Sequence, residues 1–353
     1  MKDMATVMAL VLALSGLGSV AGQGPSEGGT GGAGGVPMLG DFSYPYFGRA
    51  EDPVVHGVVH GVRRVDGGTM LYYSLGEPTE GVGAGKTPVY SRDEWDPEHY
   101  GPRTVASVSV VDPDGLQAYR PFSADGEAVA VEAREIDAAP GRLVVAWAML
   151  PEMPEGVTSV DVMMPRGSVV SDVPVEDGAL EPVVDEPAPL LGEGWPTVPV
   201  PSDLAEVDPG VSILDLTRHV GDADGTVEVE ESVEDVVVTL DADVLFDKSS
   251  FELSRSAVQE MDRVAADIAE RGTGDVVITG HTDSDGSTSD NQVLSEQRAR
   301  AVRDALQPAS GDGVTFRVVG RGEDDPVATN ATDEGQQENR RVTVEFTVEQ
   351  EER

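Results

Sequence analysis

The feature that most constrains the fold of this chain is a change of hydrophobic period that follows a β-branched run at residues 276–279. That run predicts a strand, and the polar residues 283–290 predict a loop. From Asn291 onward, apolar residues recur at spacings of three and four, which predicts an amphipathic helix. Arg298 interrupts the apolar stripe one turn into this helix, near the loop that carries Asp283. The pattern therefore predicts a carboxylate and a guanidinium at the mouth of a shallow groove.

This stretch is the first part of a longer series of motifs. In order, the motifs are Gly280-His281-Thr282-Asp283 with Gly286, Asn291, Leu294-Ser295 with Arg298-Ala299, Gly320-Arg321-Gly322-Glu323 with Pro326, Asn330, and Asn339-Arg340-Arg341-Val342. Over about 110 residues, from 236 to 348, the series resembles the OmpA-like C-terminal domain, a peptidoglycan-binding module. The chain departs from the family pattern at Gln336, where an arginine is common.

The resemblance implies a binding site for one end of a peptidoglycan peptide. It implies that Asp283 and Arg298 clamp the zwitterionic end of diaminopimelate. The chemistry is suitable, because a carboxylate accepts hydrogen bonds from an ammonium group and a planar guanidinium donates two parallel bonds to a carboxylate. A structural interpretation stays open, in which Asp283 caps the following helix and Arg298 pairs with a surface acid. Four further residues are expected at the site: Asn291, Thr282, Arg340 and Asp247.

The alternation of elements around the motifs predicts an α+β domain over residues 233–353. A helix is expected from Ser254, a suitable N-cap, to Arg271, with Gly272 as its stop. Together with the helix that carries Arg298, it gives an OmpA-like β-α-β-α-β-β order, a mixed sheet with helices on one face. The expected strands are residues 236–240, 275–279, 314–319 and 341–348.

Short β segments separated by turn residues fill residues 41–173. Their regular spacing and the lack of a long helical pattern favour a β-sandwich, for which an immunoglobulin-like arrangement is one candidate. Trp147 lies in an apolar run and is expected in the core. Residues 174–232 are dense in proline and acidic residues, which predicts an extended linker. Within it, the apolar patch at residues 211–216 is expected to dock on the next domain.

The N-terminus has the pattern of a secretion signal. Lys2 precedes an apolar segment, and Ser19-Val20-Ala21 supplies small residues for cleavage after Ala21. The apolar segment is shorter than the roughly 20 residues that a membrane-spanning helix needs. We therefore expect a signal peptide at residues 1–21, a Gly-rich tether at residues 22–40, and no transmembrane span after cleavage. Because the chain contains no cysteine, no lipid anchor or disulfide is expected.

Charge and motif content narrow the classes of function. A formal charge of −41 argues against nucleic acids and anionic membrane surfaces as partners, because both require clustered lysine and arginine. His281 has no accompanying nucleophile in a Gly-rich elbow, so an enzyme is not expected. The stretch Asp283-Ser284-Asp285-Gly286 lacks the spacing of a calcium loop. The sequence predicts no metal and no cofactor.

Two compatible interpretations of function remain. In the first, the chain is an exported, non-enzymatic protein of the cell envelope that holds peptidoglycan through its C-terminal domain. In the second, the N-terminal β-sandwich recognises a partner protein at the cell surface, and the C-terminal domain is the anchor. No motif in residues 41–173 identifies such a partner.

Overall fold

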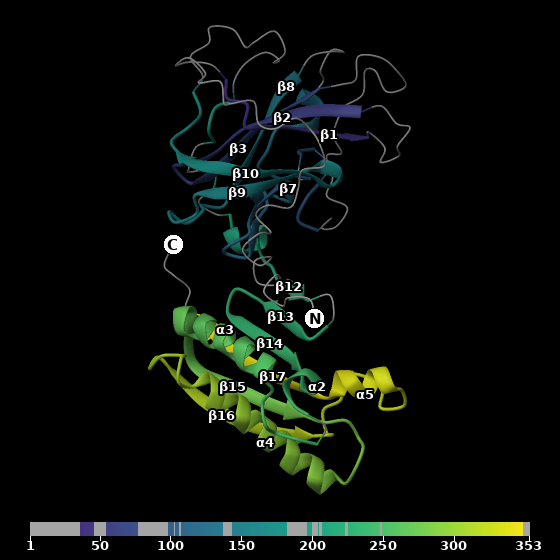
Figure 1. Ribbon diagram of the computed structural model, residues 1–353. Helices are drawn as coiled ribbons and strands as arrows, with labels where there is room; N and C mark the ends of the chain where they lie inside the picture. The colour runs from purple at the N-terminus through teal and green to yellow at the C-terminus, as the bar shows by residue number, and fades with distance from the viewer. Residues whose placement is uncertain are drawn as a thin grey trace. The chain divides into compact units, whose positions relative to one another are not determined.

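The computed structural model describes residues 36–45, 54–76, 98–101, 103–105, 107–136, 143–181, 196–199, 204, 207–222, 225–247 and 249–348 (Figure 1). The chain divides into two compact units between Leu216 and Thr217, and each unit has its own core. The expected signal peptide at residues 1–21 and residues 22–35 of the expected tether lie outside the described residues.

The C-terminal unit is built on a six-stranded mixed sheet with the order β12-β13-β14-β17-β15-β16. Strands β15 and β16 run parallel, and the other neighbouring pairs are antiparallel. This arrangement confirms the predicted α+β class with a mixed sheet. The strands are β12 (Arg218–Gly221), β13 (Val227–Glu231), β14 (Asp235–Asp241), β15 (Gly272–His281), β16 (Val314–Gly322) and β17 (Arg341–Val348).

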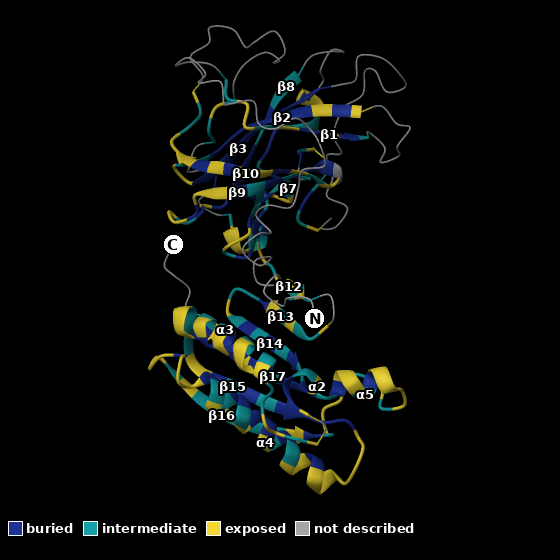
Figure 2. Ribbon diagram, in the orientation of Figure 1, coloured by how far each residue is buried: buried dark blue, intermediate teal, exposed yellow. Residues whose placement is uncertain are grey.

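The core of this unit lies between the sheet and two long helices. Alternate residues of the central strands are buried, such as Val276 and Ile278 on β15, and they pack with the apolar stripes of α3 and α4 (Figure 2). No helix in the described part of the chain is both long and apolar enough to span a membrane. The helices are α2 (Ala242–Leu245), α3 (Arg255–Arg271), α4 (Thr288–Leu306) and α5 (Asp333–Asn339).

Side-chain caps set where the two long helices begin. The hydroxyl of Ser254 accepts from the backbone N–H of Ala257 at 3.1 Å, so α3 starts where the sequence predicts. The hydroxyl of Ser287 accepts from the backbone N–H of Asp290 at 3.1 Å, so α4 begins at Thr288, before the expected start at Asn291. The serine with an acidic residue three positions later resembles a capping box, a signal that the apolar periodicity overlooks. The cap is Ser287, so the interpretation that Asp283 caps this helix is wrong.

The sheet extends N-terminally by two strands that the sequence places in a linker. β12 and β13 form a hairpin next to β14, within the predicted linker at residues 174–232. Glu231, at the end of β13, accepts a hydrogen bond from Arg218 at 2.6 Å and another from Arg271 at the end of α3. Arg271 also donates to Asp267 at 2.6 Å. These ion pairs fasten the hairpin to the helical layer.

Replacing Glu231 by glutamine should lower the stability of the C-terminal unit by about 1–2 kcal/mol at pH 7, because two partly exposed arginines lose an ionised acceptor. Burial alone would raise the pKa of Glu231, but hydrogen bonds from Arg271 and Arg218 hold it below its ordinary value. A carboxyl whose pKa is lowered by folding stabilises the fold above its unfolded pKa of about 4.3 and loses that contribution as the pH falls. The difference between wild type and variant should therefore shrink below about pH 4.

Urea titrations of the full chain at pH 7 and pH 3 check this result. All three tryptophans precede residue 217, so helical circular dichroism reports the C-terminal unit and tryptophan fluorescence reports the other. Glu228→Gln, at an exposed position of the same strand, is the matched control. An equal loss of stability at both pH values would contradict the ion-pair explanation.

The N-terminal unit consists of strands and short 3-10 turns in its described part. A path of strands, β11-β5-β4-β9-β10-β2-β3-β8, is joined by β1 on β2, and β6 pairs separately with β7. The strands are β1 (Gly40–Pro45), β2 (Val54–Val65), β3 (Gly68–Gly76), β4 (Ser109–Asp112), β5 (Gln117–Tyr119), β6 (Ser123–Ala124), β7 (Glu127–Ala128), β8 (Leu143–Leu150), β9 (Ser159–Met164), β10 (Ser168–Asp177) and β11 (Ile213–Asp215). The unit is β-rich as predicted, but this path does not establish an immunoglobulin-like arrangement.

One strand connects the two halves of this path. β10 pairs antiparallel with β9 and then, from Val175 to Asp177, parallel with β2. It therefore extends past the predicted boundary at residue 173. Side chains from both halves, such as Leu71 and Val162, contribute to one core, and Trp147 packs against it as expected.

The apolar patch at residues 211–216 belongs to the N-terminal unit. Its strand β11 pairs with β5, with Ile213 opposite Tyr119, and the buried hydroxyl of Ser212 donates to the backbone oxygen of Pro121 at 3.0 Å. The expectation that the patch docks on the next domain is therefore wrong. The physical reason is that the backbone edge of β5 pairs with β11.

Candidate functional site

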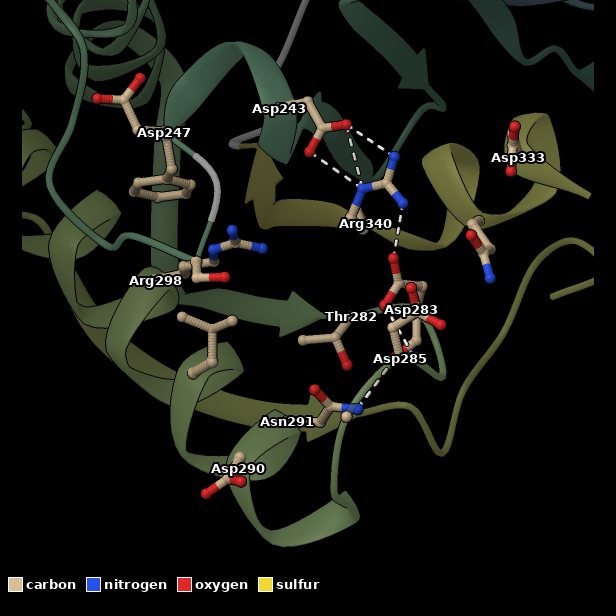
Figure 3. Close-up of a pocket in the computed structure, with 15 residues that line it drawn as sticks. Asp243, Asp247, Thr282, Asp283, Asp285, Asp290, Asn291, Arg298, Asp333 and Arg340 are labelled. Atoms are coloured by element: carbon tan, nitrogen blue, oxygen red, sulfur yellow. Dashed lines mark hydrogen bonds and ion pairs between the residues drawn. The ribbon is translucent and has the colours of Figure 1, made fainter.

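A cavity opens at one end of the C-terminal sheet, where β15 ends and α4 begins (Figure 3). Its volume is about 850 Å³, and α2, α5 and the residue before β17 complete its wall. All the residues predicted for the binding site line it: Asp247, Thr282, Asp283, Asn291, Arg298 and Arg340. The wall also includes nine residues outside that predicted set: Asp243, Phe246, Ser249, Asp285, Gly286, Asp290, Leu294, Asp333 and Gln336.

Two glycines let α4 lie close to the strands that end at the cavity. A Cβ atom on Gly280 would lie 2.1 Å from the backbone oxygen of Ser295, and one on Gly320 would lie 2.8 Å from the Ser295 hydroxyl. That hydroxyl accepts a hydrogen bond from the backbone N–H of Gly322 at 2.9 Å. The close approach fixes α4 relative to the end of β15, and these are the two elements that position the predicted clamp.

Arg298 projects from α4 into the cavity and is only 3% exposed. Its Nε donates to the backbone oxygen of Ser250 at 3.0 Å, and its guanidinium carbon lies 5.2 Å from the centre of the Phe246 ring. Burial lowers the pKa of this guanidinium, although Asp243 opposes the shift, and arginine stays protonated in proteins. No salt bridge joins Arg298 to another described residue, so pairing with a surface acid is not observed. The charge remains available to an anionic ligand.

Asp283 lies across the cavity from Arg298, and it is held by Arg340, a residue distant from it along the chain. Its Oδ2 accepts from Nη1 of Arg340 at 2.6 Å, and its Oδ1 accepts from the backbone N–H of Asp285 at 3.1 Å. The remaining donors of Arg340 bind Asp243, with its Nη2 at 2.8 Å from Oδ2. The hydrogen bond to Asp243 raises the pKa of Arg340, and the bond to Asp283 adds to this effect. Arg340 therefore positions the carboxylate of Asp283 within the cavity.

Thr282 and Asn291 complete the inner wall. The Thr282 hydroxyl is buried and has no hydrogen-bond partner among the described residues. The side-chain amide of Asn291 donates to the backbone oxygen of Asp283 at 3.2 Å and to Oε2 of Glu323 at 2.6 Å. Asn291 therefore holds the loop that carries Asp283, while Thr282 keeps a hydroxyl without a protein partner.

Two residues stand at the rim of the cavity. Asp247 is exposed, and Figure 3 shows its carboxylate directed away from Arg298. Gln336 on α5 donates from its side-chain amide to the backbone oxygen of Asn330 at 3.2 Å. The Gln336 side chain, at the position where the resemblance leads one to expect an arginine, contributes no charge to the wall.

Asn339 supports the loops around the site, although the sequence assigns it no role beyond membership of a motif. It is fully buried, and its Oδ1 accepts from the backbone N–H groups of Val327 and Ala328 at 2.8 and 3.0 Å. Its amide donates to Oδ1 of Asn330 at 3.0 Å, which also accepts from the backbone N–H of Ser284 at 3.2 Å. This network connects the start of β17 to the loop beside Asp283. Its only sequence signal is its place in the motif Asn339-Arg340-Arg341-Val342.

His281 does not line the cavity. It is buried, and its Nδ1 has no hydrogen-bond partner among the described residues. Burial lowers the pKa of His281 to about 4, and nearby Arg341 acts in the same direction. The imidazole is therefore neutral at pH 7, and its position does not support acid–base chemistry at the cavity.

Comparison with known proteins links this site to a family. The model of the OmpA family matches residues 245–340, which include all six predicted site residues and all but Asp243 of the cavity wall. A putative lipoprotein YfiB from Escherichia coli is 36% identical over 121 residues, which are 33% of this chain and 74% of that protein. The outer membrane porin F of Pseudomonas aeruginosa is 39% identical over 129 residues, covering 36% of this chain and 35% of the porin. The peptidoglycan-binding protein ArfA of Mycobacterium tuberculosis is 40% identical over 84 residues, covering 24% of this chain and 26% of ArfA.

Arg340 is the last residue of the family match, so the match spans the whole predicted site. The relatives resemble this chain only in part of their own length. The chain spans 35% of the first of the curated relatives it matches and 54% of the second. The likeness therefore concerns the C-terminal unit, and the N-terminal unit lies outside the family match.

Proposed function

The chain belongs to the OmpA family through its C-terminal unit, and from that premise we propose that this unit binds peptidoglycan non-covalently in the cavity around Arg298 and Asp283. The relative ArfA is named a peptidoglycan-binding protein, which supports the same ligand here. The chain thereby holds itself to the cell wall. No step of chemistry is needed for this role, and we infer a non-enzymatic anchor.

The observation that carries this proposal is the unmatched charge of Arg298. A buried guanidinium without a counter-ion is costly, because burial removes the charge from water. The Ser250 carbonyl and the Phe246 ring stabilise it only in part. A carboxylate from a ligand would offset the rest through two parallel hydrogen bonds.

The zwitterionic end of diaminopimelate has the two groups that this cavity fits. Its carboxylate would bind Arg298, and its ammonium would bind the carboxylate of Asp283. The Thr282 hydroxyl is available as a further hydrogen-bond donor or acceptor. Charge-assisted hydrogen bonds contribute about 1.5–3 kcal/mol each, and ordering the ligand opposes them, so a Kd in the micromolar to millimolar range is expected. Many stems on one polymer strengthen retention further.

The remaining parts of the chain complete the proposed anchor. We infer that the chain is exported to the cell envelope, an assignment that the names of its outer-membrane and lipoprotein relatives support. The N-terminal unit, whose two halves share one core, is proposed to be a β-sandwich. Its recognition of a partner protein stays a prediction.

Co-sedimentation of the full chain with purified insoluble peptidoglycan tests the proposal. The wild type should pellet with a diaminopimelate wall and at least about fivefold less with a lysine wall, because lysine lacks the carboxylate that Arg298 requires. Asp283→Asn should reduce pelleting, because it removes the charge that binds the ammonium. Asp275→Asn, on the strand that precedes Asp283 but paired with Arg317 outside the cavity, should pellet like the wild type. Equal pelleting of the folded Asp283→Asn variant would overturn the assignment to this cavity.

A further inference from the structure

The charges that line the cavity are unequal. Six aspartates and two arginines contribute to its wall. One of these arginines, Arg340, divides its donors between Asp243 and Asp283, so its charge is already matched within the protein. Among the described lining residues, Arg298 is the cation that remains for a ligand.

The charged side chains of the wall also lie at different depths in the cavity. Arg298 and Asp283 are 3% and 8% exposed, which places both groups of the proposed clamp on the inner wall. Asp243 is exposed and paired with Arg340, and the other four aspartates are exposed without a salt bridge to another described residue. The cavity therefore has one buried cation beneath an acidic rim, formed by Asp247, Asp285, Asp290 and Asp333.

Thr282 indicates independently that a polar group of a ligand reaches the inner wall. Its side chain lines the cavity, it is 5% exposed, and its hydroxyl has no hydrogen-bond partner among the described residues. A buried polar atom without a partner costs stability, and such atoms are uncommon in folded proteins. A ligand that hydrogen-bonds this hydroxyl would relieve that cost.

We propose that the cavity selects peptide stems by charge, accepting one carboxylate at Arg298 and disfavouring a second carboxylate at the acidic rim. This inference rests on the proposed function. In a diaminopimelate stem, the preceding glutamyl residue and diaminopimelate itself carry further carboxyl groups, each of which can be a carboxylate or a carboxamide. A carboxamide has nearly the same shape, carries no charge, and donates hydrogen bonds that an aspartate accepts. The favoured ligand is therefore a stem whose carboxyl groups beside the clamped end are amidated.

Gln336 is the residue that sets this selectivity. It lies on α5 between Asp333 and Arg340, and it lines the cavity with an uncharged side chain. An arginine at this position would place a cation at the rim and offer a second carboxylate a partner. Gln337 is exposed and donates to Asp241 outside the cavity wall, so the same substitution there adds the same charge without entering the site.

The test uses two synthetic tripeptides, L-alanyl-γ-D-glutamyl-meso-diaminopimelate and the same peptide with the glutamyl α-carboxyl as a carboxamide. Binding of each to the full chain is measured by calorimetry at about 10 mM and about 1 M salt, where the screening lengths are about 30 Å and 3 Å. At low salt the carboxamide peptide should bind about fivefold more tightly or better, and high salt should bring the two affinities to within about twofold. Gln336→Arg should remove the low-salt preference, and Gln337→Arg should retain it.

The outcomes separate this inference from the proposed function. Equal low-salt affinities for the two peptides, or a preference for the carboxylate peptide, would overturn the charge selection and leave peptidoglycan binding intact. If Gln336→Arg and Gln337→Arg reduce the low-salt preference equally, the preference arises from the overall charge of the protein. That result would also overturn the selection by this rim. If neither peptide binds, both this inference and the proposed function fail.

Discussion

Replacing Arg298 by methionine should reduce the affinity of the chain for diaminopimelate peptides at least about thirtyfold, because two charge-assisted hydrogen bonds to the ligand are lost. Methionine retains much of the volume of the side chain and its contact with Phe246. The C-terminal unit should remain folded, because Arg298 forms no salt bridge with a described residue and burial already disfavours its charge. Calorimetric titration gives the affinity, and circular dichroism confirms the fold.

Two substitutions sharpen this result. Arg300→Met lies on the same helix, but the Arg300 side chain is exposed and pairs with Glu296, so binding should be unchanged. Arg298→Lys keeps the charge and loses the planar fork, so its affinity should lie between those of the wild type and the methionine variant. Wild-type affinity in a folded Arg298→Met variant would show that the ligand binds elsewhere.

Replacing Gly280 by alanine should destabilise the C-terminal unit by about 2–3 kcal/mol, because an added Cβ atom cannot fit against α4. The new atom would lie 2.1 Å from the backbone oxygen of Ser295, and neither atom belongs to a flexible side chain. The helix must move away from β15, and this movement separates Arg298 from Asp283. Urea unfolding followed by helical circular dichroism gives the stability, and co-sedimentation with the diaminopimelate wall should show reduced binding.

Gly313 provides the matched control for this substitution. A Cβ atom there would meet no other atom within 4 Å, and its backbone does not require a positive φ. Gly313→Ala should therefore leave stability and binding near those of the wild type, with a small gain from the less flexible unfolded chain. If Gly280→Ala is as stable as Gly313→Ala, the close approach of α4 to β15 is not what positions the site.

The elements and lining residues of the site follow from sequence, because periodicity and turn chemistry act locally. The strand before Asp283 and the cap at Ser254 occur where the sequence places them, and the helix that carries Arg298 occurs there too, although it begins three residues earlier than expected. What the sequence could not provide is the pairing of charges inside the cavity. Arg340 binds Asp243, a residue outside every recognised motif, although several other aspartates line the same cavity. Only the packing of α2 against the start of β17 decides which of them it meets.

Pairing between strands that are distant in sequence also explains where the N-terminal unit differs from the sequence predictions. The apolar patch around Ile213 is compatible with either neighbouring unit, and its pairing with the edge of β5 at Tyr119 decides the outcome. β10 contains Pro174 and alternating acids, which resemble a linker in sequence. Its inward residues, such as Val173, are nevertheless buried, because one face of the strand covers the core. Register and sheet order depend on such contacts between distant residues, which a single sequence pattern does not specify.

The most direct test of the central claim is a nuclear magnetic resonance titration of the full, isotope-labelled chain with the diaminopimelate tripeptide. Binding in the cavity should shift the backbone amide signals of Thr282, Asp283, Asn291 and Arg298 in a saturable manner, with a Kd in the micromolar to millimolar range. Signals from the N-terminal unit should stay unchanged. Saturable shifts confined to other residues, or no shifts from a chain that still pellets with the diaminopimelate wall, would contradict peptidoglycan binding at this site.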